Sequence, residues 1–216
     1  MGASPAALLA RVPVVPVLTI ERLADAVPLA RALVTGGLPV LEVTLRTRVA
    51  LDAVKAIVAE VPDAVAGIGT VVQERDIGPS LAAGAKFLVS PGAPPALAAA
   101  LTQVPVPVMP GCATVSEAMG LAGLGFDILK FFPAEAAGGV AFLKGVAAPL
   151  PGIMFCPTGG IDQRNIEAYL ALPNVVSVGG SWIAPRDVIT DGDFGRITSL
   201  AREAVTLARR RPGDRD

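Results

Sequence analysis

The 216-residue sequence contains no histidine, and this absence excludes several kinds of chemistry at once. Serine–histidine and cysteine–histidine nucleophile pairs are excluded, together with every metal site that depends on imidazole. Any general base must therefore be Glu, Asp, Lys or the single tyrosine, Tyr169. The two cysteines, Cys112 and Cys156, lack the spacing of a metal site, and we expect both to serve packing.

Charge is also scarce, since charged residues make up 17% of the chain against 52% hydrophobic residues. The net charge of −1 and the absence of a basic stripe argue against a nucleic-acid partner. The longest uncharged run, Phe87–Ser116, holds six prolines and so cannot be one membrane-spanning helix. Residues 1–10 lack the basic start and apolar core of a signal peptide. We expect a soluble cytoplasmic protein without a membrane partner.

Strand-like apolar runs recur along the chain. They begin at residues 14, 38, 65, 87, 106, 127, 153 and 175, which are 19 to 27 residues apart. Alanine-rich amphipathic segments such as Ala50–Glu60 lie between them. Eight strand–helix units at this spacing predict an α/β fold of the (β/α)8 TIM barrel type, with an open doubly wound sheet as the alternative.

The ends of the chain complete this prediction. We expect a short N-terminal helix over about Pro5–Ala10 and a terminal helix over about Phe194–Arg210. The arginine-rich residues 209–216 are interpreted as a frayed tail. No linker interrupts residues 1–216, so we expect a single barrel domain.

One of only four lysines, Lys130, stands in the middle of the apolar run Asp127–Pro133. Burying an ammonium group is costly. Desolvation lowers the pKa of a lysine, and the neutral amine attacks carbonyl carbon. Lys130 is therefore a candidate Schiff-base lysine. The alternative is a strand-end lysine whose stem packs while its ammonium group reaches water.

A candidate proton carrier lies in the second run. Alternation along the strand places Glu42, Thr44 and Arg46 on one face. The opposite face is apolar and should meet the helices, so Glu42 is expected to point into the barrel. A carboxylate near an inward lysine can carry protons. The alternative is an ion pair with an arginine that only braces the barrel mouth. Arg46 itself could hold a substrate carboxylate in a two-pronged grip.

Glycines and hydroxyls end several other strands. Gly69-Thr70 ends the third run, and Thr70 supplies a hydroxyl at the mouth. Gly159-Gly160 and Gly179-Gly180 end the seventh and eighth, where barrel enzymes commonly bind phosphate through bare backbone N–H groups. Ser181 could add a hydroxyl donor, whereas simple turns are the alternative. Together with Lys130 and Glu42, these features describe a metal-independent aldolase acting on a phosphorylated 2-keto acid.

Six short strings, in chain order, resemble the 2-keto-3-deoxy-6-phosphogluconate (KDPG) aldolase family, also named 4-hydroxy-2-oxoglutarate aldolases. The strings are Glu42–Thr47, Gly67–Val71, Ser90–Gly92, Leu129–Glu135, Pro157–Ile161 and Gly180–Trp182. The resemblance extends from about residue 14 to about residue 207, which is nearly the whole chain.

The resemblance implies a role for each matching residue. Lys130 forms the Schiff base with the keto carbon, and Glu42 moves protons, partly through a water. The implied substrate contacts are Arg46 and Thr70 for the pyruvate carboxylate, Phe132 and Pro91 for the pocket wall, Thr158 for the hydroxylated part, and Gly159, Gly160, Gly180 and Ser181 for the phosphate. Because the family is usually homotrimeric, the resemblance also implies a homotrimer, and it implies no cofactor.

Two positions favour the gluconate substrate over its galactonate epimer. By the same resemblance, relatives that act on 6-phosphogalactonate typically lack a threonine at the position of Thr158 and a phenylalanine at that of Phe131, and both are present here. We further interpret Phe131 and Phe132 together as an apolar wall that keeps the Lys130 amine reactive.

Three other functions fit parts of the pattern. The same lysine could serve an aldolase for a different, unphosphorylated 2-keto acid. A catalytically silent barrel could act as an assembly subunit, although such a role needs neither Lys130 nor Glu42. A phosphosugar epimerase is less compatible with the sequence, because such barrels commonly use histidine ligands and the chain has none.

Overall fold

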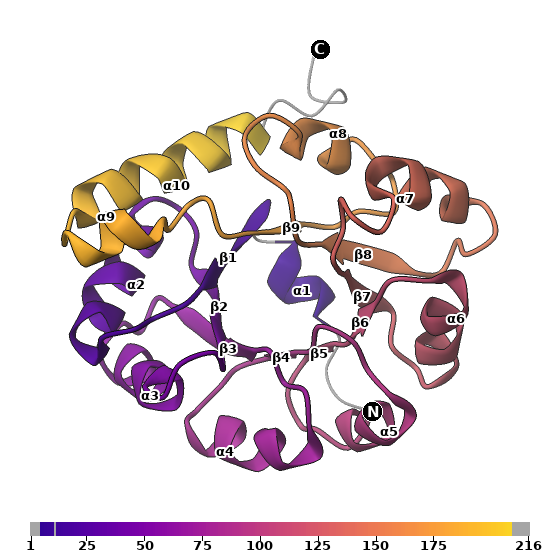
Figure 1. Ribbon diagram of the computed structural model, residues 1–216, viewed down its shortest axis with the longest axis horizontal. Helices are drawn as coiled ribbons and strands as arrows, with labels where there is room; N and C mark the ends of the chain where they lie inside the picture. The colour runs from indigo at the N-terminus through magenta and orange to yellow at the C-terminus, as the bar shows by residue number, and fades with distance from the viewer. Residues whose placement is uncertain (1–4, 11, 209–216) are drawn as a thin grey trace.

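The computed structural model describes residues 5–10 and 12–208, and it places parallel strands around a central axis inside a layer of helices (Figure 1). The strands are β1 Val14–Leu18, β2 Val40–Thr44, β3 Val65–Gly69, β4 Leu88–Val89, β5 Val108–Met109, β6 Gly111–Cys112, β7 Ile128–Phe131, β8 Met154–Pro157 and β9 Val178–Gly180. The α-helices are α1 Ala6–Leu9, α2 Ala26–Thr35, α3 Ala50–Glu60, α4 Ile77–Ala82, α5 Pro95–Leu101, α6 Val115–Gly123, α7 Gly139–Ala147, α8 Ile166–Leu170, α9 Arg186–Thr190 and α10 Phe194–Ala208. Two 3-10 turns, η1 Leu23–Asp25 and η2 Glu74–Asp76, precede α2 and α4.

The strands form two parallel sheets. The larger has the order β5-β4-β3-β2-β1-β9, and the smaller has the order β6-β7-β8. Isolated parallel bridges from Phe155 to Val175 and from Thr158 to Gly179 link the two sheets along β8 and β9. A doubly wound sheet reverses its order at an interior strand, whereas this order runs from β5 to β1 without reversal. The doubly wound alternative is therefore wrong.

Seven of the eight predicted runs contain one strand each, the eighth run, Val175–Val178, reaches only the first residue of β9, and β6 is an addition. Pro110 separates β5 from β6, because proline has no N–H to donate to a ladder. The uncharged run that could have been mistaken for a membrane span forms β4, α5, β5 and β6. Within the described part of the chain, no helix is both long and apolar enough to cross a membrane.

Alternation along the strands separates two apolar layers. On β2, Leu41 and Val43 face the large core between strands and helices, whereas Val40 belongs to the inner core enclosed by the strands. On β7, Leu129 faces the outer core and Ile128 the inner one. The outward side chains of a strand covered by helices have to be apolar, whereas its inward side chains can also be polar or charged.

The short helix α1 covers one end of the strand assembly. Leu9 is fully buried and clusters with Val15, Val40 and Phe87, side chains near the beginnings of their strands. Figure 1 shows α1 across the middle of the ring of strands. The predicted N-terminal helix is confirmed, and it seals the end opposite to the carboxyl ends of the strands.

The terminal helix α10 packs on α2. Thr198 Oγ1 donates a hydrogen bond of 3.1 Å to the carbonyl oxygen of Ala32. The predicted terminal helix is confirmed as far as Ala208. Its last two predicted residues and the predicted tail, residues 209–216, lie outside the described residues.

Candidate functional site

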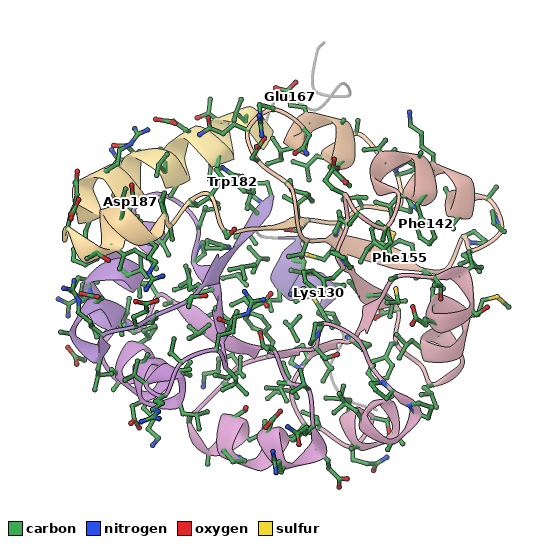
Figure 2. All side chains as sticks on the ribbon, viewed as in Figure 1. Lys130, Phe142, Phe155, Glu167, Trp182 and Asp187 are labelled. Carbon is green, nitrogen blue, oxygen red and sulfur yellow. The ribbon has the colours of Figure 1, made fainter. Side chains whose placement is uncertain are left out.

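The inward face of β7 meets the inward face of β2 in a buried ion pair. Lys130 Nζ donates a hydrogen bond of 2.9 Å to Glu42 Oε1. Lys130 is 4% exposed and Glu42 is 2% exposed, and Figure 2 places Lys130 inside the ring of strands. The inward orientation predicted for both residues is confirmed. The strand-end alternative for Lys130 and the Glu42–arginine alternative are both wrong.

Strand alternation puts this pair one step beyond the apolar inner core. Glu42 lies two residues after Val40, and Lys130 lies two residues after Ile128, on the same faces of their strands. Burying both charges is costly, and the 2.9 Å contact offsets part of that cost. Because buried charges concentrate at functional sites, this pair makes the carboxyl ends of the strands the candidate active end.

Cys156 is the neighbour of Lys130 in the strand register between β7 and β8. Burial raises the pKa of its thiol to about 12, the nearby Lys130 opposes that shift, and Glu42 adds to it. The thiol is therefore protonated at neutral pH. It fills space beside the ion pair, as the packing role expected from the sequence requires.

Gly69 makes room for the Glu42 carboxylate. A Cβ atom at this position would overlap Glu42 Oε1 and lie 2.6 Å from its Cγ. The next residue, Thr70, has a positive φ of 63°, which is uncommon for a residue other than glycine. The end of β3 is thus shaped by the carboxylate that lies across it.

The two adjacent phenylalanines lie on opposite sides of β7. The ring of Phe132 lies with its centroid 5.5 Å from Lys130 Nζ. Phe131 instead stacks on Phe142 of α7 with ring centroids 4.6 Å apart, and meets Phe155 edge-on. Figure 2 shows Phe142 and Phe155 on the helix side of the strands. The prediction that Phe131 forms a wall for the amine is wrong, because the strand period turns it into the outer core.

The glycine pair after β8 forms a true loop. Gly159 and Gly160 have φ values of 102° and 79°, which residues with a side chain rarely adopt. A Cβ on Gly159 would lie 3.3 Å from the Phe132 ring. This loop therefore packs against the segment that follows Lys130.

The second glycine pair belongs to β9 itself. Gly180 is the last residue of that strand, and a Cβ there would overlap the ring of Trp182. A Cβ on Gly179 would overlap Thr158 Oγ1. These two glycines allow close packing of side chains, and the exposed Ser181 directly follows them.

The other predicted residues lie at the same end of the strands. Arg46 is exposed in the turn after β2 and forms no ion pair with any residue that the structure describes. Pro91 is half-buried after β4, and its backbone lies against Gly111. Thr158 is 7% exposed, with its hydroxyl 3.4 Å from the carbonyl oxygen of Cys156. Within the described part of the chain, these side chains form neither a hydrogen bond nor an ion pair with Lys130, whose partner is Glu42.

Sequence reasoning missed contacts made by α8 and by Asn165, the residue directly before it. Tyr169 donates a short hydrogen bond from its phenol to Glu135 Oε1. Asn165 Nδ2 donates to the carbonyl oxygen of Gly160 at 2.9 Å. Only the uniqueness of the tyrosine in a histidine-free chain singled out either residue beforehand.

Among residues 5–10 and 12–208, no group of three His, Cys, Asp or Glu side chains could hold a metal ion.

Comparison with known proteins gives consistent matches. Residues 6–200 match the family model described as KDPG and KHG aldolase. The chain is 52% identical over 196 residues to the 2-dehydro-3-deoxy-phosphogluconate aldolase of Dickeya dadantii, covering 91% of this chain and 92% of that protein. It is 50% identical over 197 residues to the KHG/KDPG aldolase of Escherichia coli strain K12, with 91% and 92% covered.

A solved structure extends the likeness to three dimensions. The KDPG aldolase from Legionella pneumophila aligns with a TM-score of 0.92 and 46% sequence identity, over 94% of this chain and 98% of that one. In that crystal structure, pyruvate is captured at low pH as a covalent carbinolamine intermediate.

Proposed function

The chain belongs to the KDPG and KHG aldolase family, and from that premise we propose how its residues divide one aldol cleavage among them. The enzyme splits KDPG into pyruvate and glyceraldehyde 3-phosphate. It also splits 4-hydroxy-2-oxoglutarate (KHG) into pyruvate and glyoxylate. The buried bond between Lys130 and Glu42 carries the assignment of roles, because it joins a nucleophile to a group that can take its proton.

The first stage forms an imine. Glu42 accepts a proton from Lys130, and the neutral amine attacks the C2 carbonyl carbon to give a carbinolamine. Loss of the C2 hydroxyl as water, with a proton returned by Glu42, leaves a protonated imine. The 2.9 Å separation is within the range for direct proton transfer, and the Phe132 ring 5.5 Å away supports the nearby positive charge.

The second stage breaks the carbon–carbon bond. Glu42, by way of water, takes the proton from the C4 hydroxyl, so the C3–C4 electrons flow into the protonated imine, which releases the aldehyde and leaves an enamine. Glu42, by way of water, protonates C3 to form the methyl group, and hydrolysis frees pyruvate from Lys130. Covalent catalysis of this kind replaces one high barrier with several lower ones.

Other residues hold the substrate in this scheme. Arg46 and Thr70 bind the pyruvate carboxylate, and the exposed Arg46, without an acid partner among the described residues, supports that role. Pro91 and Phe132 border the reacting carbons. Thr158, at the end of β8, contacts the hydroxylated part and favours the gluconate epimer.

In this scheme, the substrate phosphate binds at the loop that contains Gly159 and Gly160. Gly159, Gly160 and Gly180 present backbone without side chains, and Ser181 adds a hydroxyl donor. The positive φ values of Gly159 and Gly160 support a backbone shaped for an anion. Binding of this remote group positions the reacting bond.

Borohydride reduction in the presence of pyruvate tests the central role. We expect the reduced pyruvate adduct on the peptide that contains Lys130 and on no other. Lys55, Lys86 and Lys144 are exposed and act as internal controls for non-specific reaction. Peptide mass mapping decides the outcome, and an adduct confined to one of those three lysines contradicts the assignment.

A Gly69→Ala substitution should inactivate the enzyme although Lys130 and Glu42 are both retained. The added Cβ forces the Glu42 carboxylate away from Lys130, and a displacement of about 1 Å costs about 100-fold in rate. The measurement is kcat for KDPG cleavage. Gly78→Ala is the matched control, since nothing lies within 4 Å of its added Cβ. Equal activity of the two variants would refute the proposed geometry.

We further propose that the two sheets form one closed eight-stranded barrel and that residues 1–216 form one domain. β5 and β6 are the two halves of a strand interrupted at Pro110, and the bridges between β8 and β9 support closure.

We also propose a homotrimer, for which light scattering should return three times the 21.9 kDa chain mass.

A further inference from the structure

Asn165, the residue directly before helix α8, holds the glycine loop. The side-chain amide of Asn165 donates to the carbonyl oxygen of Gly160 at 2.9 Å, and its carbonyl oxygen accepts from the backbone N–H of Asp162 at 2.9 Å. Both ends of the segment 160–162 are therefore fixed to one side chain.

Glu135 holds the same loop from the other side. Its backbone N–H donates to the carbonyl oxygen of Gly159 at 3.1 Å. Its Cγ and Cβ lie 2.6 and 2.7 Å from the position that a Cβ on Gly160 would occupy. The stem of Glu135 thus lies directly against the Gly160 Cα, and only glycine fits beneath it.

Tyr169 fixes the carboxylate of Glu135. The phenol, on the fully buried Tyr169, donates to Glu135 Oε1. Burial and, next, the bond to the Glu135 carboxylate raise the pKa of the phenol above its ordinary value, so it remains a donor at neutral and moderately alkaline pH. The only tyrosine of the chain is committed to this contact.

We propose that Glu135 and Tyr169 are positioning residues that hold the Gly159-Gly160 loop in the conformation that receives the substrate phosphate. This inference rests on the phosphate site proposed above. A loop with two glycines at positive φ has many alternative conformations. The hydrogen bond from Tyr169 to Glu135 and the packing of Glu135 on Gly160 exclude these conformations before the substrate binds. The bond to Tyr169 also keeps a carboxylate from turning toward the phosphate, where like charges would repel.

Tyr169→Phe removes the bond and keeps the ring. We expect KM for KDPG to rise about tenfold, since hydrogen bonds to charged groups are worth about that factor, while kcat changes by less than about twofold. KM for KHG, which has no phosphate, should stay at the wild-type value. Glu135→Gln keeps an accepting oxygen and should restore most of the KDPG affinity that Glu135→Ala loses. Glu167→Gln, exposed on the same helix, is the matched control.

Hydrogen exchange supplies a readout that does not depend on substrate. Mass spectrometry should show faster exchange across residues 158–162 in Tyr169→Phe than in wild type or Glu167→Gln. Unchanged exchange with unchanged KM for KDPG overturns the positioning role, as does an equal rise of KM for both substrates.

Ser181→Ala separates this inference from the one on which it depends. If wild type does not discriminate between the two substrates and Ser181→Ala leaves KM for KDPG unchanged, the phosphate site itself is refuted. Faster exchange in Tyr169→Phe then shows a loop clamp that does not serve phosphate, which refutes the proposal as stated.

Discussion

Lys130→Met is expected to abolish KDPG cleavage, lowering kcat by about 10⁴-fold or more, the scale on which removal of an enzyme nucleophile acts. Methionine keeps most of the side-chain volume but forms no imine. Steady-state turnover and borohydride trapping with pyruvate should both fall to background. Activity above about 1% of wild type would contradict the role of Lys130, because the proposed mechanism contains no route to cleavage without the imine.

The same substitution should also destabilise the fold. It leaves Glu42 buried without its partner, and breaking a buried ion pair costs about 3–5 kcal/mol. A second substitution, Glu42→Leu, removes the unpaired charge and should recover much of that loss in denaturant unfolding while activity stays absent. Recovered stability without recovered activity separates the chemical role of the pair from its structural one.

Glu42→Gln is expected to lower kcat by about 10²- to 10⁴-fold, the usual contribution of a positioned acid–base group. Glutamine keeps the shape and an accepting oxygen, so some imine with pyruvate should still be trapped on Lys130. The exchange of pyruvate methyl hydrogens with deuterium oxide, followed by NMR, should be lost to a greater extent than trapping.

Glu117→Gln provides a matched control for that experiment. Glu117 is an exposed carboxylate of the capping box at the start of α6, where hydrogen bonds from Ala113 and Thr114 lower its pKa. Removing its charge should leave methyl exchange unchanged. A Glu42→Gln enzyme that exchanges at the wild-type rate would assign the proton transfer to another group.

The features that followed from the sequence depend on local periodicity. A strand turns successive side chains to opposite faces, so the apolar Leu41 and Val43 already indicated that Glu42 points inward. For Lys130, its place in the middle of an apolar run indicated burial before any contact was known. Because parallel strands bring their carboxyl ends to one edge, the two residues could be expected to meet although 88 positions separate them.

The features that the sequence did not reveal depend on tertiary contacts. Phe131 was paired with Phe132 by adjacency, whereas the alternation that placed Lys130 inward turns Phe131 onto Phe142. The Tyr169–Glu135 bond joins residues 34 positions apart on a helix and a loop, for which no period exists. Gly179-Gly180 was interpreted as a phosphate-binding pair at the end of the eighth run, with a simple turn as the alternative. Both are residues of β9, and the side chains of Thr158 and Trp182 occupy the space beside them.

The helix that seals one end of the strands has a consequence for the hydrogens of the reaction. Beneath the ion pair, the interior is filled with hydrocarbon from Leu9, Val15, Val40 and Phe87, so the described residues on this side of the pair are apolar. We therefore expect Glu42 to exchange hydrogens with water through the carboxyl ends of the strands, where the substrate enters. We expect bound substrate at that end to slow the exchange of the hydrogen on Glu42 with bulk water. An isotopic label taken from the substrate can then return to the product before it is washed out.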